Sequence, residues 1–182
     1  MLQNAGVAFE AISSAVDERA LERELLAAGA SPGAVALALA EAKARAIPAE
    51  REAFVIGADQ TLEAAGERWH KPTDCDEARR QIAALSGRSH QLHSAVVGLR
   101  PGYPPWRHLA TATLTMRKLK AEEVEAYLDQ AGAAATASVG AYQIEGPGIQ
   151  LFETIEGDYF TILGLPLLPL LKWLREAGAL AP

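Results

Sequence analysis

Apolar residues recur at helical spacing in five stretches of the chain, and two of these begin with clear capping signals. Ser31 followed by Pro32 predicts a helix start, because a cap residue and a proline at the first helical position both favour initiation. Asp74 and Glu77 form a capping-box pattern that starts another helix. We expect helices over residues 17–29, 31–47, 74–86, 121–130 and 166–177.

Shorter apolar runs predict the strands. Ala53–Ala58 has the pattern of a buried strand, and a turn at Ala65-Gly66 would return the chain in a hairpin that contains Trp69. The low-complexity segment 133–138 is expected to be a linker. Helices and strands alternate in the first half, with an antiparallel pair in the middle, which predicts an α/β or α+β protein with a mixed sheet, and of these we expect α/β. The further strands are expected over residues 91–99, 108–116 and 149–155.

Composition narrows the class of protein. The chain has 182 residues, of which 49% are hydrophobic and 22% charged, and this balance is typical of a folded soluble domain. A net charge of −6 disfavours nucleic acid as the main partner. The lone Cys75 excludes an intramolecular disulfide, and neither a signal peptide nor an apolar run long enough for a bilayer is recognisable. We therefore expect a cytoplasmic protein without a membrane partner.

Asp59 is the strongest candidate for a catalytic or metal-binding residue. It directly follows the buried run Ala53–Ala58, and ligands of α/β sheets collect at the carboxyl ends of strands. A carboxylate at that place can bind a divalent cation or accept a proton from water. The alternative is that Asp59 starts a turn or caps a neighbouring element. The pattern alone leaves both interpretations open.

Four further charged residues also have structural explanations. Lys71 and Lys43 could each pair with a phosphate, although a solvated lysine explains either position better on pattern alone. Glu18 stands at a helix start, where the macrodipole favours an acidic residue. Glu145 lies in the glycine-dense segment 140–148, which fits a ligand-contacting loop and a plain tight turn equally well.

Six short motifs follow one another along the chain. They are Val55-Ile56-Gly57-Ala58-Asp59, Lys71-Pro72, Leu85-Ser86-Gly87-x-x-His90, Gly140-Ala141-Tyr142-x-Ile144-Glu145-Gly146, Glu156-Gly157-Asp158-Tyr159 and Gly164-Leu165-Pro166-Leu167. Each motif is weak alone, but their order and spacing over about residues 1–178 resemble the Maf family of nucleoside triphosphate pyrophosphatases.

The resemblance implies one domain over residues 1–182, with a mixed α/β fold similar to the inosine triphosphate pyrophosphatases and two lobes around a cleft. It implies hydrolysis of a non-standard or modified nucleoside triphosphate to the monophosphate and pyrophosphate, assisted by Mg²⁺ or Mn²⁺. The proton-accepting carboxylate falls on Asp59, and the other polar cleft residues fall on Glu18, Lys43, Lys71 and Glu145. Asp59 and Glu18 are the expected metal ligands.

Two departures from the family pattern affect these expectations. Asp59 is followed by Gln60, as in the subgroup that includes 7-methyl-GTP pyrophosphatases, and this pair alone does not assign the base. Members usually begin with a strand and an S-x-S-x-R-R loop, which have no counterpart before Met1–Val7. A chain without that loop should bind triphosphate weakly and expose a sheet edge, which favours a homodimer. The alternative is thus a truncated, catalytically weak nucleotide-binding or cell-division-associated protein. A third interpretation is that the loop Pro101–Trp106, expected to be exposed, docks a protein partner.

Overall fold

The structure is a computed structural model that describes residues 1–48 and 53–181. Five strands form one antiparallel sheet in the order β2-β1-β3-β4-β5. The strands are β1 (Val55–Ala64), β2 (Glu67–Trp69), β3 (Ser89–Leu99), β4 (Trp106–Met116) and β5 (Phe152–Glu156). The α-helices are α1 (Glu18–Ala27), α2 (Pro32–Arg45), α3 (Cys75–Leu85), α4 (Ala121–Ala131), α5 (Tyr159–Ile162) and α6 (Leu167–Glu176).

The chain divides into two compact units, and strands β1, β3 and β4 contribute residues to both. The first unit consists of Met1–Gln60, His93–Ala110 and Asp158–Pro182. The second consists of Thr61–Leu92 and Thr111–Gly157. No helix within the described ranges is long and apolar enough to cross a bilayer.

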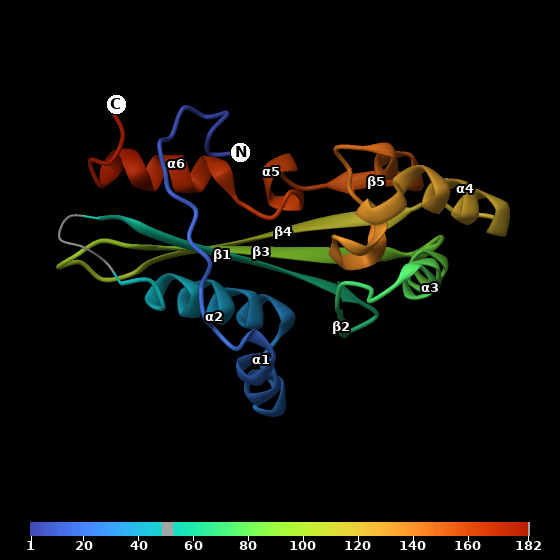
Figure 1. Cartoon of the computed structure of the whole chain (residues 1–182), viewed down its shortest axis with the longest axis horizontal. Coiled ribbons are helices and arrows are strands. Elements are labelled where there is room, and N and C mark those ends of the chain that lie inside the picture. Colours follow the sequence, from blue (N-terminus) through green and yellow to red (C-terminus); the bar gives the residue numbers. More distant parts are fainter. Residues whose placement is uncertain (49–52, 182) are drawn as a thin grey trace. The chain divides into compact units, whose positions relative to one another are not determined.

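In the first unit, helices α2 and α6 cover opposite faces of the sheet (Figure 1). Successive residues of β3 point to opposite faces, so Ala95 and Val97 pack toward α2 while Val96 packs toward α6. The same alternation directs Val55 of β1 toward α2 and Ile56 toward α6. Both faces of β1 and β3 are thus covered in this unit, which explains why these strands appear in the sequence as nearly continuous apolar runs.

In the second unit, α3 packs against α4 and against short 3₁₀ helices. The hairpin of β1 and β2 pairs Leu62 with Trp69 and Ala64 with Glu67. Its turn residues Ala65 and Gly66 have φ angles of 55° and 81°, as a tight two-residue hairpin turn requires. The three 3₁₀ helices are η1 (Gly132–Thr136), η2 (Val139–Ala141) and η3 (Pro147–Leu151).

The predicted α/β class is confirmed, as are the five long helices and the hairpin turn at Ala65-Gly66. The sheet is antiparallel and not mixed. Most of the expected linker 133–138 forms η1, and the strand expected over 149–155 begins only at Phe152, after η3. The four-residue helix α5 was not expected, since one turn leaves almost no periodicity to detect.

Trp106, the last residue of the expected docking loop Pro101–Trp106, is half-buried. Its ring stacks on Trp173 with a centroid distance of 5.2 Å and on His108 at 6.0 Å. The tip of the loop before it instead carries Tyr103, which is exposed and lies under the guanidinium of Arg100 at 3.9 Å. Trp106 therefore contributes to packing in the first unit, and its role in partner binding stays a prediction.

Candidate active site

A stripe of alanines lets α2 pack closely against β1. Ala36, Ala40 and Ala44 recur every four residues, so they share one face of the helix, and all three are fully buried. Gly57 of β1 faces this stripe: a Cβ added there would lie 2.1 Å from the carbonyl oxygen of Ala40. The small residues bring the two backbones together, and this approach places Lys43, the neighbour of Ala44, beside β1.

Lys43 lies between two carboxylates. Its Nζ donates a hydrogen bond to Asp59 Oδ1 at 2.7 Å and lies 3.0 Å from Glu18 Oε1. Asp59 is two residues beyond Gly57 on β1, and this spacing puts both residues on the face that α2 covers. The structure therefore brings three of the five predicted site residues together within the first unit.

The start of α1 positions Glu18. Asp17 caps this helix by accepting a hydrogen bond from the backbone N–H of Ala20 at 3.0 Å, and Glu18 is the first helical residue. The predicted stabilisation of an acidic residue at the helix start and an ion pair with Lys43 are thus both present. The structural and functional explanations of Glu18 do not exclude each other.

Burial differs strongly among the three side chains. Asp59 is 10% exposed and Lys43 23% exposed, whereas Glu18 is 47% exposed and forms the solvent side of the cluster. Burial alone would lower the pKa of Lys43, but the hydrogen bond and charge of Asp59, followed by those of Glu18, outweigh it and raise the pKa. Lys43 is consequently a fixed positive charge at neutral pH and not the solvated lysine that its helix pattern favoured.

The donor set of this cluster is small but chemically suited to a hard cation. Carboxylate oxygens are the protein ligands that Mg²⁺ and Mn²⁺ prefer, and those of Asp59 and Glu18 converge on the Nζ of Lys43. Among the described residues, no group of three or more His, Cys, Asp or Glu side chains could hold a metal ion. Asp59 and Glu18 fit a cation that also takes ligands from water and from phosphate, as Mg²⁺ commonly does.

Comparison with known proteins extends this picture. The family model described as Maf-like protein matches residues 1–177. The chain belongs to the Maf family. It is 55% identical to a protein of Rhizobium meliloti (strain 1021) and 58% identical to one of Mesorhizobium japonicum, both named 7-methyl-GTP pyrophosphatase, over 99% of this chain and 91% of each relative. It is also 51% identical to a Rhodopseudomonas palustris protein named nucleoside triphosphate pyrophosphatase, over 100% of this chain and 89% of that relative.

The other two residues suggested by the Maf resemblance belong to the second unit. Lys71 is exposed in the segment between β2 and α3, next to the buried Pro72. Glu145 is exposed in the segment between η2 and η3. Their roles as substrate-binding residues stay predictions.

Hydrogen bonds hold the glycine-dense segment that carries Glu145. Tyr127 donates its hydroxyl proton to the carbonyl oxygen of Ala141 at 2.9 Å, and the Tyr142 hydroxyl lies 2.6 Å from Nε2 of the buried His90. A Cβ at Gly148 would lie 2.5 Å from the carbonyl oxygen of Gln143, so the chain closes tightly on itself. The turn interpretation is therefore correct for the backbone, and a rigid turn can still present Glu145 to a ligand.

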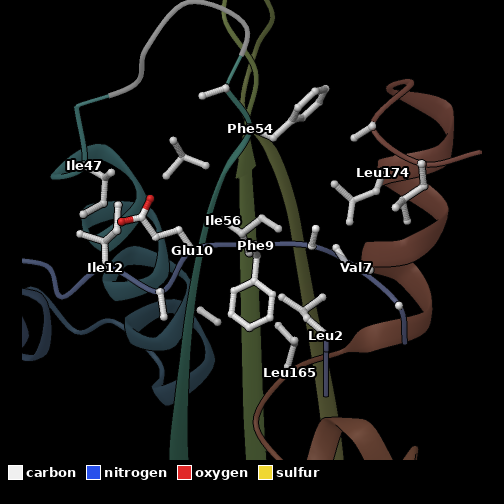
Figure 2. A pocket seen from close by; sticks show the side chains of 18 of the residues that line it. Leu2, Val7, Phe9, Glu10, Ile12, Ile47, Phe54, Ile56, Leu165 and Leu174 are labelled. Carbon is white, nitrogen blue, oxygen red and sulfur yellow. The ribbon is translucent and has the colours of Figure 1, made fainter. Parts of the chain in front are cut away.

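A separate apolar cavity of about 1060 Å³ lies beneath the N-terminal segment of the first unit (Figure 2). Phe9 and Val7 of that segment, Phe54 of the chain leading into β1, and Leu174 of α6 line it, and Glu10 is its one charged lining residue in the described chain. Neither Lys43 nor Asp59 lines this cavity. An apolar wall with a single carboxylate is unsuited to a polyphosphate, so the candidate chemistry lies at the Lys43 cluster.

Sequence reasoning missed the residues on the opposite face of β1. Gln60 follows Asp59 and therefore points away from α2, where it meets the fully buried Ser94 of β3. The detectable signal was the serine that directly precedes the apolar run Ala95–Leu99. A buried hydroxyl in such a run requires a hydrogen-bond partner, and the sequence alone does not show which residue provides it.

Proposed function

We propose that this Maf-family chain is a nucleoside triphosphate pyrophosphatase that releases pyrophosphate and a nucleoside monophosphate. The names of its relatives support the reaction class. The observation that carries the proposal is the shielded Lys43–Asp59 pair, 2.7 Å apart, with Glu18 on its solvent side. A largely buried ion pair of this kind is a candidate functional site because its charges are costly to maintain for packing alone.

Asp59 is the proposed proton acceptor. In this reaction the oxygen of water adds to phosphorus, its proton passes to the Asp59 carboxylate, and the bridging oxygen leaves with the electron pair of the broken P–O bond. Before substrate binds, the Lys43 ammonium donates a hydrogen bond to the Asp59 carboxylate. A phosphate oxygen that draws the Lys43 ammonium toward itself would free this carboxylate oxygen to accept the proton. A general base of this kind contributes roughly 10²- to 10⁴-fold to the rate.

A divalent cation is part of the proposal. Asp59 and Glu18 are the residues that would hold Mg²⁺ or Mn²⁺, since their oxygens already converge on one positive charge. When bound, such a cation supplies neutralisation of phosphate charge. The protein contributes the spacing of the two carboxylates and the partial exclusion of water around Asp59.

The proposed substrate is a modified purine nucleotide, with 7-methyl-GTP as the first to test. Relatives with that name share 50–58% of their residues with this chain. Lys71 and Glu145 are the proposed further substrate contacts, Lys71 for phosphate and Glu145 for another polar part of the nucleotide. A homodimer, a cytoplasmic location, and the absence of nucleic-acid and membrane partners stay predictions.

Product analysis on the full chain tests this function. Separate reactions with 7-methyl-GTP, GTP, UTP and dTTP in Mg²⁺ or Mn²⁺ are expected to yield pyrophosphate and monophosphate in equal amounts, with the highest kcat/KM for 7-methyl-GTP. Orthophosphate with a nucleoside diphosphate would contradict the bond assignment. Nucleotide binding in calorimetry without turnover in either metal would favour the catalytically weak binding protein instead.

A further inference from the structure

Gln60, the residue after Asp59, has one side-chain nitrogen within hydrogen-bond distance of three oxygen atoms. The side-chain Nε2 of Gln60 lies 2.8 Å from Ser94 Oγ, 3.0 Å from the carbonyl oxygen of Thr161 and 3.0 Å from that of Ile162. All four residues belong to the first unit. Ser94 and Thr161 are almost completely buried, so these polar groups have little access to water.

The hydrogen-bond donors and acceptors around the side-chain nitrogen of Gln60 match one another. Ser94 donates its single hydroxyl proton to the carbonyl oxygen of Thr161 at 2.6 Å, so its Oγ is free to accept from Gln60. Nε2 has two protons for three acceptors, and one proton is therefore shared. Every neighbour of Nε2 in this network is an oxygen that accepts, so the position requires an N–H donor. A carboxylate here would face three oxygen atoms without a proton.

The hydrogen bonds of Gln60 hold the short helix α5, which would not be stable by itself. Helix α5 has four residues, and a single turn has no stability by itself in water. Asp158 caps its start by accepting from the Thr161 N–H at 2.9 Å. Gln60 donates to the carbonyl groups of Thr161 and Ile162 at the other end of α5, and the Thr161 carbonyl also accepts from the backbone N–H of Gly164 at 3.1 Å. The short helix is thereby tied directly to β1.

The same bonds fix β1 at the point where it carries Asp59. Adjacent strand residues point to opposite faces, so Asp59 is held by Lys43 from one side and Gln60 by α5 from the other. We propose that Gln60 is a positioning residue for the reaction, whose amide group anchors β1 to α5 and so holds the Asp59 carboxylate in register with Lys43. This inference rests on the proposed function of Asp59.

Two substitutions at Gln60 distinguish a role in positioning Asp59 from a role in the stability of the protein alone. Gln60→Met keeps the length of the side chain but removes both donors. Gln60→Glu keeps the shape and places a carboxylate among acceptors, and it regains one O–H donor only when protonated. Gln130→Glu, on the exposed surface of α4, is the control for the added charge. Thermal denaturation establishes the temperature at which all four proteins are folded, and kinetics are measured below it.

We expect both Gln60 variants to lose about 10- to 100-fold in kcat, with KM changed less than about twofold, because a small displacement of a catalytic group affects the chemical step most. Gln130→Glu should keep the wild-type kcat, which would show that an added charge alone does not cause the loss. Folded Gln60 variants with wild-type kcat, or with the loss confined to KM, would overturn the inference.

A second readout does not depend on turnover. At one pH, hydrogen exchange of the backbone amides of α5 should be faster in Gln60→Met than in the wild type and in Gln130→Glu. Unchanged exchange would contradict the anchoring role. If the wild type itself releases no pyrophosphate, the proposed function fails, whereas the exchange rates still decide whether Gln60 anchors β1 to α5.

Discussion

The Nζ of Lys43 in α2 lies 2.7 Å from Oδ1 of Asp59 in β1, and the two residues are 16 positions apart in the sequence. The contact depends on the alanine stripe of α2 and on Gly57, which let the two backbones approach. The Lys43–Asp59 ion pair and the packing of small residues between α2 and β1 therefore depend on each other. A substitution in either should affect both.

Replacing Lys43 by Met should reduce kcat by roughly 10²- to 10³-fold, because the fixed charge beside the reacting phosphate is lost. The free energy of unfolding should fall by about 1–3 kcal/mol, since the Asp59 carboxylate keeps little access to solvent and loses a partner. Steady-state kinetics and urea denaturation measure the two effects. Glu41→Gln on the same helix is the matched control, because Glu41 pairs with Arg107 and Arg45 instead. Equal losses in both variants would argue against a specific role for Lys43.

Adding one methyl group at Gly57 should disrupt the same contact from the packing side. A Cβ there would meet the carbonyl oxygen of Ala40 at 2.1 Å and the backbone nitrogen of Ala44 at 2.7 Å, and neither backbone atom can rotate away. Gly57→Ala should therefore destabilise the protein by about 3 kcal/mol or more and lower kcat. In Gly146→Ala the nearest atom to the new Cβ would be 3.9 Å away, so its urea midpoint should stay close to that of the wild type. A Gly57→Ala protein as stable and active as the wild type would show that α2 and β1 do not need this close approach.

Acid should destabilise the protein through His90. Burial lowers the pKa of His90 from 6.5 to about 4, and its Nε2 lies 2.6 Å from the Tyr142 hydroxyl. The unfolded chain therefore binds a proton more readily than the folded one, so the stabilising contribution is complete above about pH 6.5 and is lost as the pH falls toward 4.

Between pH 7.5 and pH 5 the free energy of unfolding should decrease by about 2 kcal/mol from this group alone, at about 1.4 kcal/mol per pH unit below the unfolded pKa. Urea denaturation at the two pH values measures it. His90→Gln should lack most of this decrease, whereas the exposed His70→Gln should retain it. The same acid sensitivity in His90→Gln as in the wild type would assign the effect to other groups.

The sequence predicted those site residues whose role is visible in the local sequence pattern. Asp59 follows an apolar run, and its importance could be recognised from that position, while Lys43 and Glu18 were suggested only by the resemblance to the Maf family. Their meeting could not be derived from periodicity, because it depends on how closely α2 approaches β1 through Gly57. Lys43 looked solvated, since its neighbours Glu41 and Arg45 are charged, yet Glu41 and Arg45 pair with each other and leave Lys43 to face the strand.

Other features of the structure could not be predicted because the residues that form them lie far apart in the sequence. The anchoring of α5 requires Gln60, Ser94 and two carbonyl groups near residue 161, and backbone carbonyls have no sequence signature. The segment 133–138 looked like a linker because alanines and small polar residues carry little periodicity. In the structure, Ala135 is buried and anchors the 3₁₀ helix η1 in the second unit.

The most direct test of the central claim is pyrophosphate release from 7-methyl-GTP by Asp59→Asn. The amide has nearly the shape of the carboxylate but cannot accept the proton, so kcat should fall by roughly 10²- to 10⁴-fold. Glu41→Gln, which removes a carboxylate of the same unit that pairs with Arg107, should retain the wild-type rate. Wild-type turnover by a folded Asp59→Asn protein would remove Asp59 from the mechanism and contradict the account.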